Sequence, residues 1–377
     1  MEKEVPERRT SKQVLETARL CIEALAQRVS YNNSTPGVRE IAATLLEAHE
    51  DIRVPPHLLK FLPTHSPQAR SNFLASARDN AIFQLWARSK VVYAMDDLML
   101  HYLAQSSVSK IPTSVLQALP HANPFILLPQ ADTNDPEVAY WRTHIGVPVG
   151  AIVFGRFNDA RQLCSTADEQ REDLGLMFVG WIDTEEHGAV LQTVRCTIPL
   201  RRDHLSVEDV VNATVDKFHF NADLGEDSNE KLEQWLRHHV TQIFNSLLYV
   251  CTDQPDTEIY RPSVNRAGKA KSSKKQRRPR PDDISTVVKV GFRLGPALHA
   301  AKQQSDARDK SEGESTGRRQ RPHQRAGHWR TFWTGPGREI EKLNWVRPYW
   351  VSTDLLSEGD TPNDVVIRPV TYKETKR

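Results

Sequence analysis

The chain has 377 residues, which at roughly 100 to 200 residues per domain allows two or three packed units and excludes a single small core. Hydrophobic residues make up only 38%, so we expect part of the chain to be loop or tail. The net charge of +2 is unevenly distributed, because nine basic and no acidic residues lie between Arg261 and Arg280. Without those nine, 41 of the 50 basic residues remain against 48 acidic ones, which predicts a mildly acidic body with one basic segment.

Four cysteines, Cys21, Cys164, Cys196 and Cys251, are scattered without a Cys-x-x-Cys spacing or a neighbouring histidine cluster. This pattern argues against a zinc site or a disulfide framework and favours a reducing compartment. The charged start and the lack of any run of 18 apolar residues predict neither a signal peptide nor a transmembrane span. We therefore expect a soluble cytoplasmic protein without a metal or another cofactor.

The first part of the chain has the spacing of amphipathic helices. Apolar residues recur every three to four positions over residues 11–30 and 37–50, and the longest such pattern runs from Ser71 to Leu103. The second pattern ends at Val54-Pro55-Pro56, because proline lacks a backbone donor and restricts the residue before it. We expect residues 1–120 to form a helical N-terminal region.

Residues 121–260 predict a central α+β domain. Short segments rich in β-branched residues and bounded by proline, glycine or polar turn residues indicate strands over residues 125–128, 147–154, 176–181 and 190–198. The last two are expected to form a β-hairpin around the polar residues 183–188. Two amphipathic helices follow, one beginning at Ser206 and the other near Asp227.

Residues 261–283 are expected to be a flexible basic loop, because they offer almost no apolar side chain to offset the entropy of ordering. The loop would attract RNA or ribosomes at long range without reading sequence, and a merely solvated loop is the alternative. The candidate residues for this electrostatic attraction are Lys269, Lys271, Lys274, Lys275, Arg277, Arg278 and Arg280.

Residues 284–352 predict a strand, a short helix and a two-stranded ribbon around Gly335-Pro336-Gly337 that pack on the central domain, followed by a tail over residues 353–377. The expected fold class is α+β. It combines an N-terminal helical layer, a central mainly antiparallel sheet packed with helices, and a C-terminal tryptophan-rich β-ribbon.

The segment 318–333 carries the densest chemical signal, with five arginines, two histidines, two tryptophans and a phenylalanine. Guanidinium groups match phosphate oxygens and flat rings stack on bases, so this pattern is typical of a nucleic-acid or acidic-peptide surface. The alternative is a small tryptophan core with a solvated arginine face. The candidate partner-binding residues are Arg321, His323, Arg325, His328, Trp329, Arg330 and Trp333.

Two roles are expected within this set. Trp329 and Trp333 are four residues apart in a predicted strand and therefore share a face, so we expect both to be core residues. Arg321, Arg325 and Arg330 are harder to bury and are expected to meet water or a partner.

Enzyme motifs are absent: no phosphate-binding loop, serine-hydrolase elbow, zinc-protease or dinucleotide fingerprint occurs. The sequence therefore does not predict an enzyme, although intrinsic ribonuclease activity through His323 and His328 stays open. His238 and His239 are neighbours on a predicted helix, so they point to different sides and cannot share one metal ion.

The block from Arg321 to Gly335 resembles the C-terminal signature of the second type V-A anti-CRISPR family, Arg-Pro-His-x-Arg-x-Gly-His-Trp-x-x-[Tyr/Phe]-Trp-x-Gly, in every defined position. Weaker similarity extends upstream in the same order, so that the resemblance covers about residues 70–352. It includes Trp86–Arg88 with Tyr93–Asp96, the strand ending in Asp183-Thr184, the helix ending in Cys251 with Asp253–Glu258, and Arg293–Gly295.

This resemblance implies an antagonist of the type V-A CRISPR nuclease (Cas-twelve-a), encoded on phages or plasmids and acting in the cytoplasm of a bacterial host. It also implies binding to the N-terminal peptide of the nuclease as that peptide leaves the ribosome, with loss of the translated mRNA. The implied partners include the ribosome, the mRNA or a host ribonuclease, and no membrane. Two alternatives are an RNA-binding protein or ribonuclease acting on mRNA, and a plasmid regulatory protein without a CRISPR link.

Overall fold

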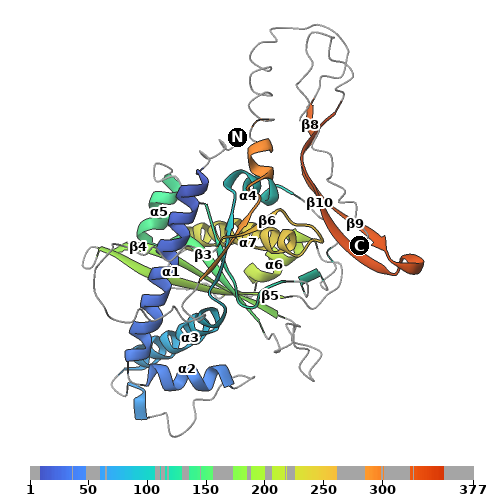
Figure 1. Ribbon diagram of the computed structural model, residues 1–377. Coiled ribbons are helices and arrows are strands. Elements are labelled where there is room, and N and C mark those ends of the chain that lie inside the picture. Colours follow the sequence, from blue (N-terminus) through green and yellow to red (C-terminus); the bar gives the residue numbers. More distant parts are fainter. Residues whose placement is uncertain are drawn as a thin grey trace, which may run out of the picture.

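Figure 1 shows a computed structural model of the chain. The structure describes residues 9–35, 37–47, 60–63, 66–106, 111, 115–116, 119–129, 136–144, 146–155, 173–184, 188–199, 206–216, 218, 226–260, 285–298, 300, 323–325 and 327–351. The expected basic loop 261–283 and tail 353–377 lie outside these residues. Within the described part, none of the helices combines the length and the apolar character needed to cross a membrane.

A seven-stranded sheet forms the centre of the molecule, in the order β5-β4-β3-β2-β1-β7-β6. Strand β1 pairs in parallel with β2 and β7, and the other neighbours pair antiparallel, which confirms the mainly antiparallel sheet. The strands are β1 (Val91–Met95), β2 (Phe125–Leu127), β3 (Val147–Phe154), β4 (Asp173–Thr184), β5 (Gly188–Pro199), β6 (Thr257–Tyr260) and β7 (Thr286–Val290).

The expected helix from Ser71 to Leu103 is wrong in its middle, because strand β1 interrupts it. Helix α3 (Pro67–Ser89) ends at Lys90, whose φ of 49° is left-handed, and helix α4 (Asp97–Ala104) begins after the strand. All five residues of β1 are buried, so the strand is covered on both faces. A strand buried on both faces is apolar throughout and shows no period of two, which is why its sequence continues the helical pattern.

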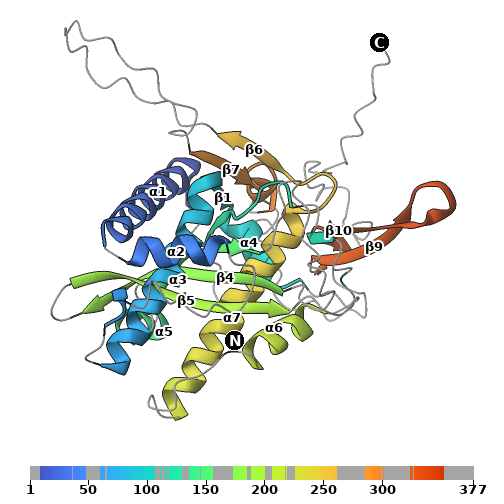
Figure 2. The same ribbon diagram turned by 90° about the horizontal axis from the view of Figure 1, so that it is seen from below.

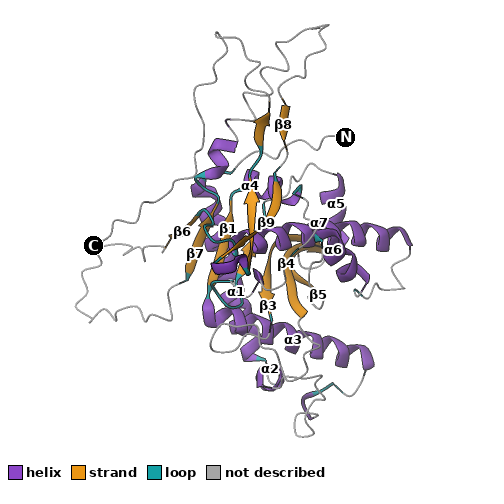
Figure 3. Cartoon of the chain, turned by 90° about the vertical axis from the view of Figure 1, so that its right-hand side faces the viewer, coloured by secondary structure: helices purple, strands orange, loops and turns teal. Residues whose placement is uncertain are grey.

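The N-terminal helices cover one face of the sheet (Figures 2 and 3), as the expected helical layer requires. Helices α1 (Ser11–Ser34) and α3 pack against β1, β2, β3 and β4, with Leu25, Phe83 and Trp86 in the shared core. Helix α2 (Val38–Glu47) lies against α3 in a smaller apolar cluster.

The opposite face carries α4, α5 (Pro136–His144), α6 (Val207–Asp216) and α7 (Glu226–Val250), whose apolar side chains form the larger core. The two helices expected from Ser206 and near Asp227 are therefore present. Ser206 caps α6, since its Oγ accepts the backbone N–H of Asp209 at 3.0 Å, and its own N–H donates to Oδ2 of Asp209 at 3.0 Å. The apolar stripe of α7 lies on the sheet along much of its length.

The predicted hairpin of β4 and β5 and the predicted C-terminal ribbon are both confirmed. Strands β9 (His328–Thr334) and β10 (Ile340–Val346) pair antiparallel around a turn in which Gly335 and Gly337 have φ angles of 83° and 74°, a region that favours glycine. The ribbon projects from the body (Figures 1 and 2). A second two-stranded sheet pairs β8 (His323–Arg325) with β11 (Tyr349–Val351).

The packing of α1 on the sheet predicts a difference between two of its leucines. Leu25 is 1% exposed and Leu20 is 52% exposed. Leu25→Ala should lower the free energy of unfolding by about 2 to 5 kcal/mol, because it leaves a cavity in the core. Leu20→Ala, the matched control, should change it by no more than about 0.5 kcal/mol. Urea titrations followed by circular dichroism measure both, and equal losses would show that α1 does not pack in this way.

Candidate partner-binding site

Two buried tryptophans anchor the β9–β10 ribbon to the body. Nε1 of Trp329 donates a hydrogen bond to Oδ1 of Asn245 on α7 at 2.8 Å. Nε1 of Trp345 donates to Oγ of Ser106, just after α4, at 2.9 Å, and its ring packs edge-on against Tyr249 with centroids 5.9 Å apart. The two tryptophans are direct partners across the ribbon, so both indole N–H groups are satisfied where the rings are buried. The base of the ribbon is therefore fixed in position.

A third attachment is an ion pair at the edge of the same base. Nζ of Lys342 on β10 donates to Oδ2 of Asp253, in the segment that joins α7 to β6. Both side chains are partly exposed, so the pair contributes little to stability and chiefly orients the strand. The neighbouring Leu343 is buried in the core and supplies the apolar part of this contact.

Beyond its base the ribbon is exposed. Trp333 is 55% exposed and faces Glu341 across the ribbon, whereas Ile340 is 53% exposed and faces Thr334. Since side chains alternate along a strand, Trp333 shares the face of the buried Trp329 and Ile340 lies on the other face. We define the exposed ribbon surface as Arg330, Trp333, Arg338 and Ile340, all of which are exposed.

The expectation that Trp333 is a core residue is wrong. The strand period places it on the same face as Trp329, as expected, but the helices that cover this face at the base do not extend to Trp333. Alternation along a strand tells which residues share a face, and it cannot tell how far the neighbouring layer reaches. Trp329 is buried as expected.

The other candidate residues are distributed over two ribbons. His328 is partly buried on β9, and Arg330 is exposed on the same strand as expected. His323 and Arg325 belong to β8, where the structure describes the backbone but not the side chains. Arg321 and the basic residues from Lys269 to Arg280 lie outside the described residues. The structure thus brings together His328, Trp329, Arg330 and Trp333 on one strand, and it places His323 and His328 in separate two-stranded sheets.

Three of the upstream segments that resemble the family, those with Asp96, Asp256 and Arg293–Gly295, contact one another or α7. Asp96 caps α4, and a Cβ on Gly295 would lie 2.1 Å from its carboxylate, so the glycine permits a close approach. Asp256 accepts hydrogen bonds from the backbone N–H and Nε of Arg293 at 2.9 and 2.6 Å. The hydroxyl of Tyr249 in turn accepts the N–H of Asp256 at 2.9 Å. These contacts join the ends of β1, β7 and α7, and α7 also carries Asn245, the partner of Trp329.

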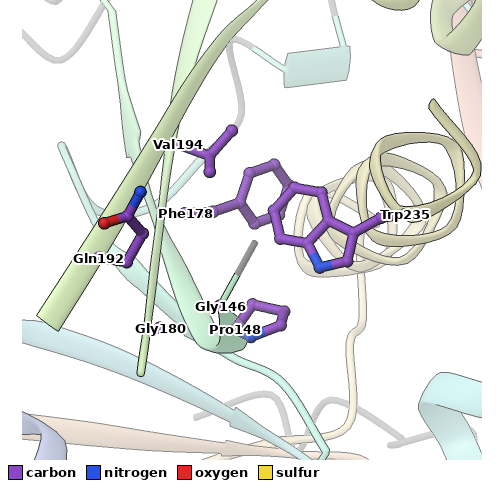
Figure 4. A pocket seen from close by; sticks show the side chains of 7 residues that line it. All are labelled: Gly146, Pro148, Phe178, Gly180, Gln192, Val194 and Trp235. Atoms are coloured by element: carbon purple, nitrogen blue, oxygen red, sulfur yellow. The ribbon is translucent and has the colours of Figure 1, made fainter. Parts of the chain in front are cut away.

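A small recess lies between α7 and the sheet (Figure 4). The rings of Phe178 and Trp235 meet in it edge-on, with centroids 5.2 Å apart. The recess has room for about one water molecule, which is too little for a peptide side chain. Nε1 of Trp235, which lines the recess, and Nε2 of the neighbouring His239 are buried without a hydrogen-bond partner among the described groups. The lining residues are Gly146, Pro148, Phe178, Gly180, Gln192, Val194 and Trp235.

Titratable groups in the described part of the chain do not form a catalytic cluster. Burial raises the pKa of the thiols of Cys21, Cys196 and Cys251 to about 12, so they stay protonated and unreactive. No three histidine, cysteine or acidic side chains among the described residues are grouped as metal ligands. His238 is exposed and His239 is buried, in agreement with their different sides of the helix.

Fold and site together define an α+β protein in which a large mixed sheet carries a firmly anchored, projecting ribbon. The model of the AcrVA2-like family, the anti-CRISPR type V subtype A2 family, matches residues 93–353, more than two thirds of the chain. The protein therefore belongs to this family, as the resemblance of its tail indicates, and has an anti-CRISPR function against type V-A systems. A comparison with curated proteins finds no match.

Sequence reasoning missed the two partners of the anchoring tryptophans. Asn245 and Ser246 interrupt the apolar stripe of α7, and a buried polar side chain requires a hydrogen-bond partner, so this interruption could have indicated a contact. Ser106 follows α4 in an ordinary polar segment, and nothing in the sequence singles it out.

The two tryptophans of β9 should differ in their effect on stability. Trp329→Ala removes a buried ring and leaves Asn245 without its donor, so it should lower the free energy of unfolding by about 3 to 5 kcal/mol. Trp333→Ala removes a largely exposed ring and should cost less than about 1 kcal/mol. Thermal and urea unfolding of the two variants measure the difference. A loss for Trp333→Ala as large as that for Trp329→Ala would contradict the exposed position of the outer ribbon.

His239 should make the protein less stable in mild acid. Burial, followed by the nearby His238, holds its pKa well below the ordinary value of 6.5. Below pH 6.5 the unfolded chain therefore binds a proton at this position that the folded chain rejects, and stability falls by up to about 1.4 kcal/mol per pH unit until the folded pKa is reached.

The measurement is urea unfolding at pH 7.5, 6.5 and 5.5. His239→Phe should flatten the dependence of the free energy of unfolding on pH, because it removes the titrating group. The control is His238→Gln, which changes the exposed neighbour and leaves His239 in place. If His239→Phe lost stability on acidification as steeply as the parent, another group would be responsible.

Proposed function

We propose that this protein blocks production of the type V-A nuclease by recognising the N-terminal segment of its nascent polypeptide, with loss of the translated mRNA as the result. Family membership supports the anti-CRISPR function. The proposal adds the target, which is the nascent polypeptide, and the step that is blocked, which is production of the nuclease. One observation carries it. On a single strand inside the family block, Trp329 is locked into the core and Trp333 is held out in solvent.

An exposed tryptophan on a fixed strand is suited to binding a polypeptide. Tryptophan and arginine are the residues that most often dominate binding energy at protein interfaces. The base of the ribbon is fixed by the hydrogen bonds of Trp329 and Trp345, so little conformational entropy is lost when a partner contacts Trp333. A nascent chain is extended and presents alternating side chains, which can lie along a ribbon that exposes Trp333 on one face and Ile340 on the other.

RNA is the second candidate for this surface, because tryptophan stacks on bases and arginine binds phosphate. The charges on the face that carries Trp333 favour polypeptide instead, because Arg330 and Lys342 lie on the opposite face. Glu341 lies directly opposite Trp333, and Glu339 is exposed in the adjoining turn, so carboxylates flank the ring on which a base would stack. Such carboxylates repel a phosphate backbone and accept hydrogen bonds from a peptide.

We further propose that loss of the mRNA depends on a host ribonuclease or on the ribosome itself. The two histidines considered for ribonuclease chemistry, His323 and His328, belong to separate two-stranded sheets, which favours an activity supplied by another component. Recognition of the nascent chain would direct that activity to the message being translated.

Co-expression with a tagged nuclease tests the target, with nuclease protein and mRNA measured together. Synonymous recoding of the first codons keeps the peptide and changes the RNA, so the effect should persist. A compensated frameshift over the same codons keeps most of the RNA sequence and changes the peptide, so the effect should disappear. Trp333→Ala should weaken the effect several-fold without unfolding the protein, while Tyr31→Ala on α1, another exposed aromatic residue, should leave it unchanged.

Loss of the effect on recoding, together with its persistence on frameshifting, would replace peptide recognition with RNA recognition. Unchanged activity of folded Trp333→Ala would remove the exposed ribbon surface from the proposal.

A further inference from the structure

An arginine from the start of the described chain is buried against the carboxyl ends of two central strands. Nε of Arg9 donates to Oδ2 of Asp97 at 2.9 Å, and the backbone N–H of Arg9 donates to the same oxygen at 3.0 Å. Nη2 of Arg9 also donates to the carbonyl of Leu128 at 3.2 Å. The side chains of Arg9 and Asp97 are only 9% and 3% exposed, so this ion pair lies inside the protein.

The position of this pair is one where open sheets bind ligands. Asp97 follows the end of β1, and Leu128 follows the end of β2, which lies beside β1 and runs parallel to it. In open sheets of mostly parallel strands, ligands bind outside the carboxyl ends of the strands, and β2, β1 and β7 form the parallel part of this mainly antiparallel sheet. A carboxylate buried at this edge requires a cation, because an unpaired buried charge is strongly unfavourable.

The two halves of the pair come from different parts of the chain. Asp97 and Leu128 lie inside residues 93–353, the part that matches the family, whereas Arg9 lies outside it. Arg9 also fits incompletely, since its Nη1 is buried without a hydrogen-bond partner among the described groups. Residues 93–353 therefore supply a site for a cation, and Arg9, from outside these residues, occupies it.

The contacts define the ligand closely. A guanidinium meets a carboxylate and a carbonyl, and the main-chain N–H of the same residue meets that carboxylate, so an arginine within a polypeptide is recognised rather than a free cation. The carboxylate repels phosphate and excludes nucleic acid from this position.

We propose that Asp97 and the carbonyl of Leu128 form an arginine-binding site that Arg9 occupies from within the chain and that an arginine of a bound extended polypeptide occupies in its place. The identity of that polypeptide rests on the proposed function. The arginine-binding site does not rest on the proposed function, so an experiment can test the site and the function separately. Arg9 then acts as a competitor: its removal raises the fraction of molecules in which the site is open and thereby the apparent affinity.

Fluorescence anisotropy with labelled synthetic peptides tests the site on the full chain. The first probe copies Pro6–Gln13 of this protein, and its control carries citrulline in place of Arg9, which keeps the shape and removes the charge. The Arg9→Ala variant should bind the arginine peptide at least about tenfold more tightly than the parent does, and it should not bind the citrulline peptide. Arg9→Ala combined with Asp97→Asn should lose this binding. Failure of folded Arg9→Ala to bind the arginine peptide would overturn the inference.

The second probe is the N-terminal segment of the nuclease, with and without citrulline at its arginines. Tighter, arginine-dependent binding to Arg9→Ala than to the parent is the expected result. If this segment binds neither protein while the Pro6–Gln13 peptide binds the variant, the proposed function fails and the site stands. If it binds parent and variant equally, the function stands and the arginine site is not where the peptide binds.

Hydrogen exchange on the parent protein keeps the test independent of the folding of the variants. The N–H of Val14 donates to the carbonyl of Thr10 at 3.0 Å in the first turn of α1, directly after Arg9. Displacement of Arg9 by saturating peptide should loosen this turn and speed exchange there. Unchanged exchange at saturation would show that Arg9 keeps its place, and the inference would be wrong.

Discussion

Strand β1 imposes the constraint on which the rest of the structure depends, because all five of its residues are buried. A strand with two apolar faces must be covered on both of them. The chain supplies this cover in order: α3 comes immediately before β1 and packs with α1 on one face, and α4 follows β1 and packs with α7 on the other. The ribbon is attached to the second layer, since Ser106 follows α4 and Asn245 belongs to α7.

The N-terminal helices complete this core although they lie outside the matched residues 93–353. Without α1 and α3, the face that carries Val92, Phe125 and Ile152 would be open to water. The family match therefore begins in the middle of a core, and residues 93–353 of this chain have one face of their sheet covered by residues that precede them. The pairing of Arg9 with Asp97 is a second connection of the same kind.

Much of the fold follows from sequence patterns that act over short distances. The β4–β5 hairpin, the helix capped by Ser206 and the ribbon around Gly335–Gly337 are each predicted by residues within one element or turn. The errors occur where burial depends on helices that are distant in the sequence. A strand buried on both faces lacks the alternation that identifies strands, so the sequence pattern predicts helix where β1 lies. The pattern also predicts Trp333 in the core, because no local feature shows where the helical layer ends. For the same reason the partners Asn245 and Ser106 could not be paired with Trp329 and Trp345 from sequence, since they are 84 and 239 residues away.

The paired anchors of the ribbon also determine how far it reaches. Trp329 and Trp345 face each other and hold separate partners on two helices, so a slip of the ribbon by one residue would turn both indoles to the wrong face. With a rise of about 3.4 Å per residue, the four residues from Trp329 to Trp333 place the exposed ring about 14 Å beyond the anchor. The anchored ribbon therefore holds the exposed ring at a fixed distance from the body. A two-residue insertion in each strand would keep every face and move the ring outward by about 7 Å, so reach could vary between such proteins while the anchored base stayed the same.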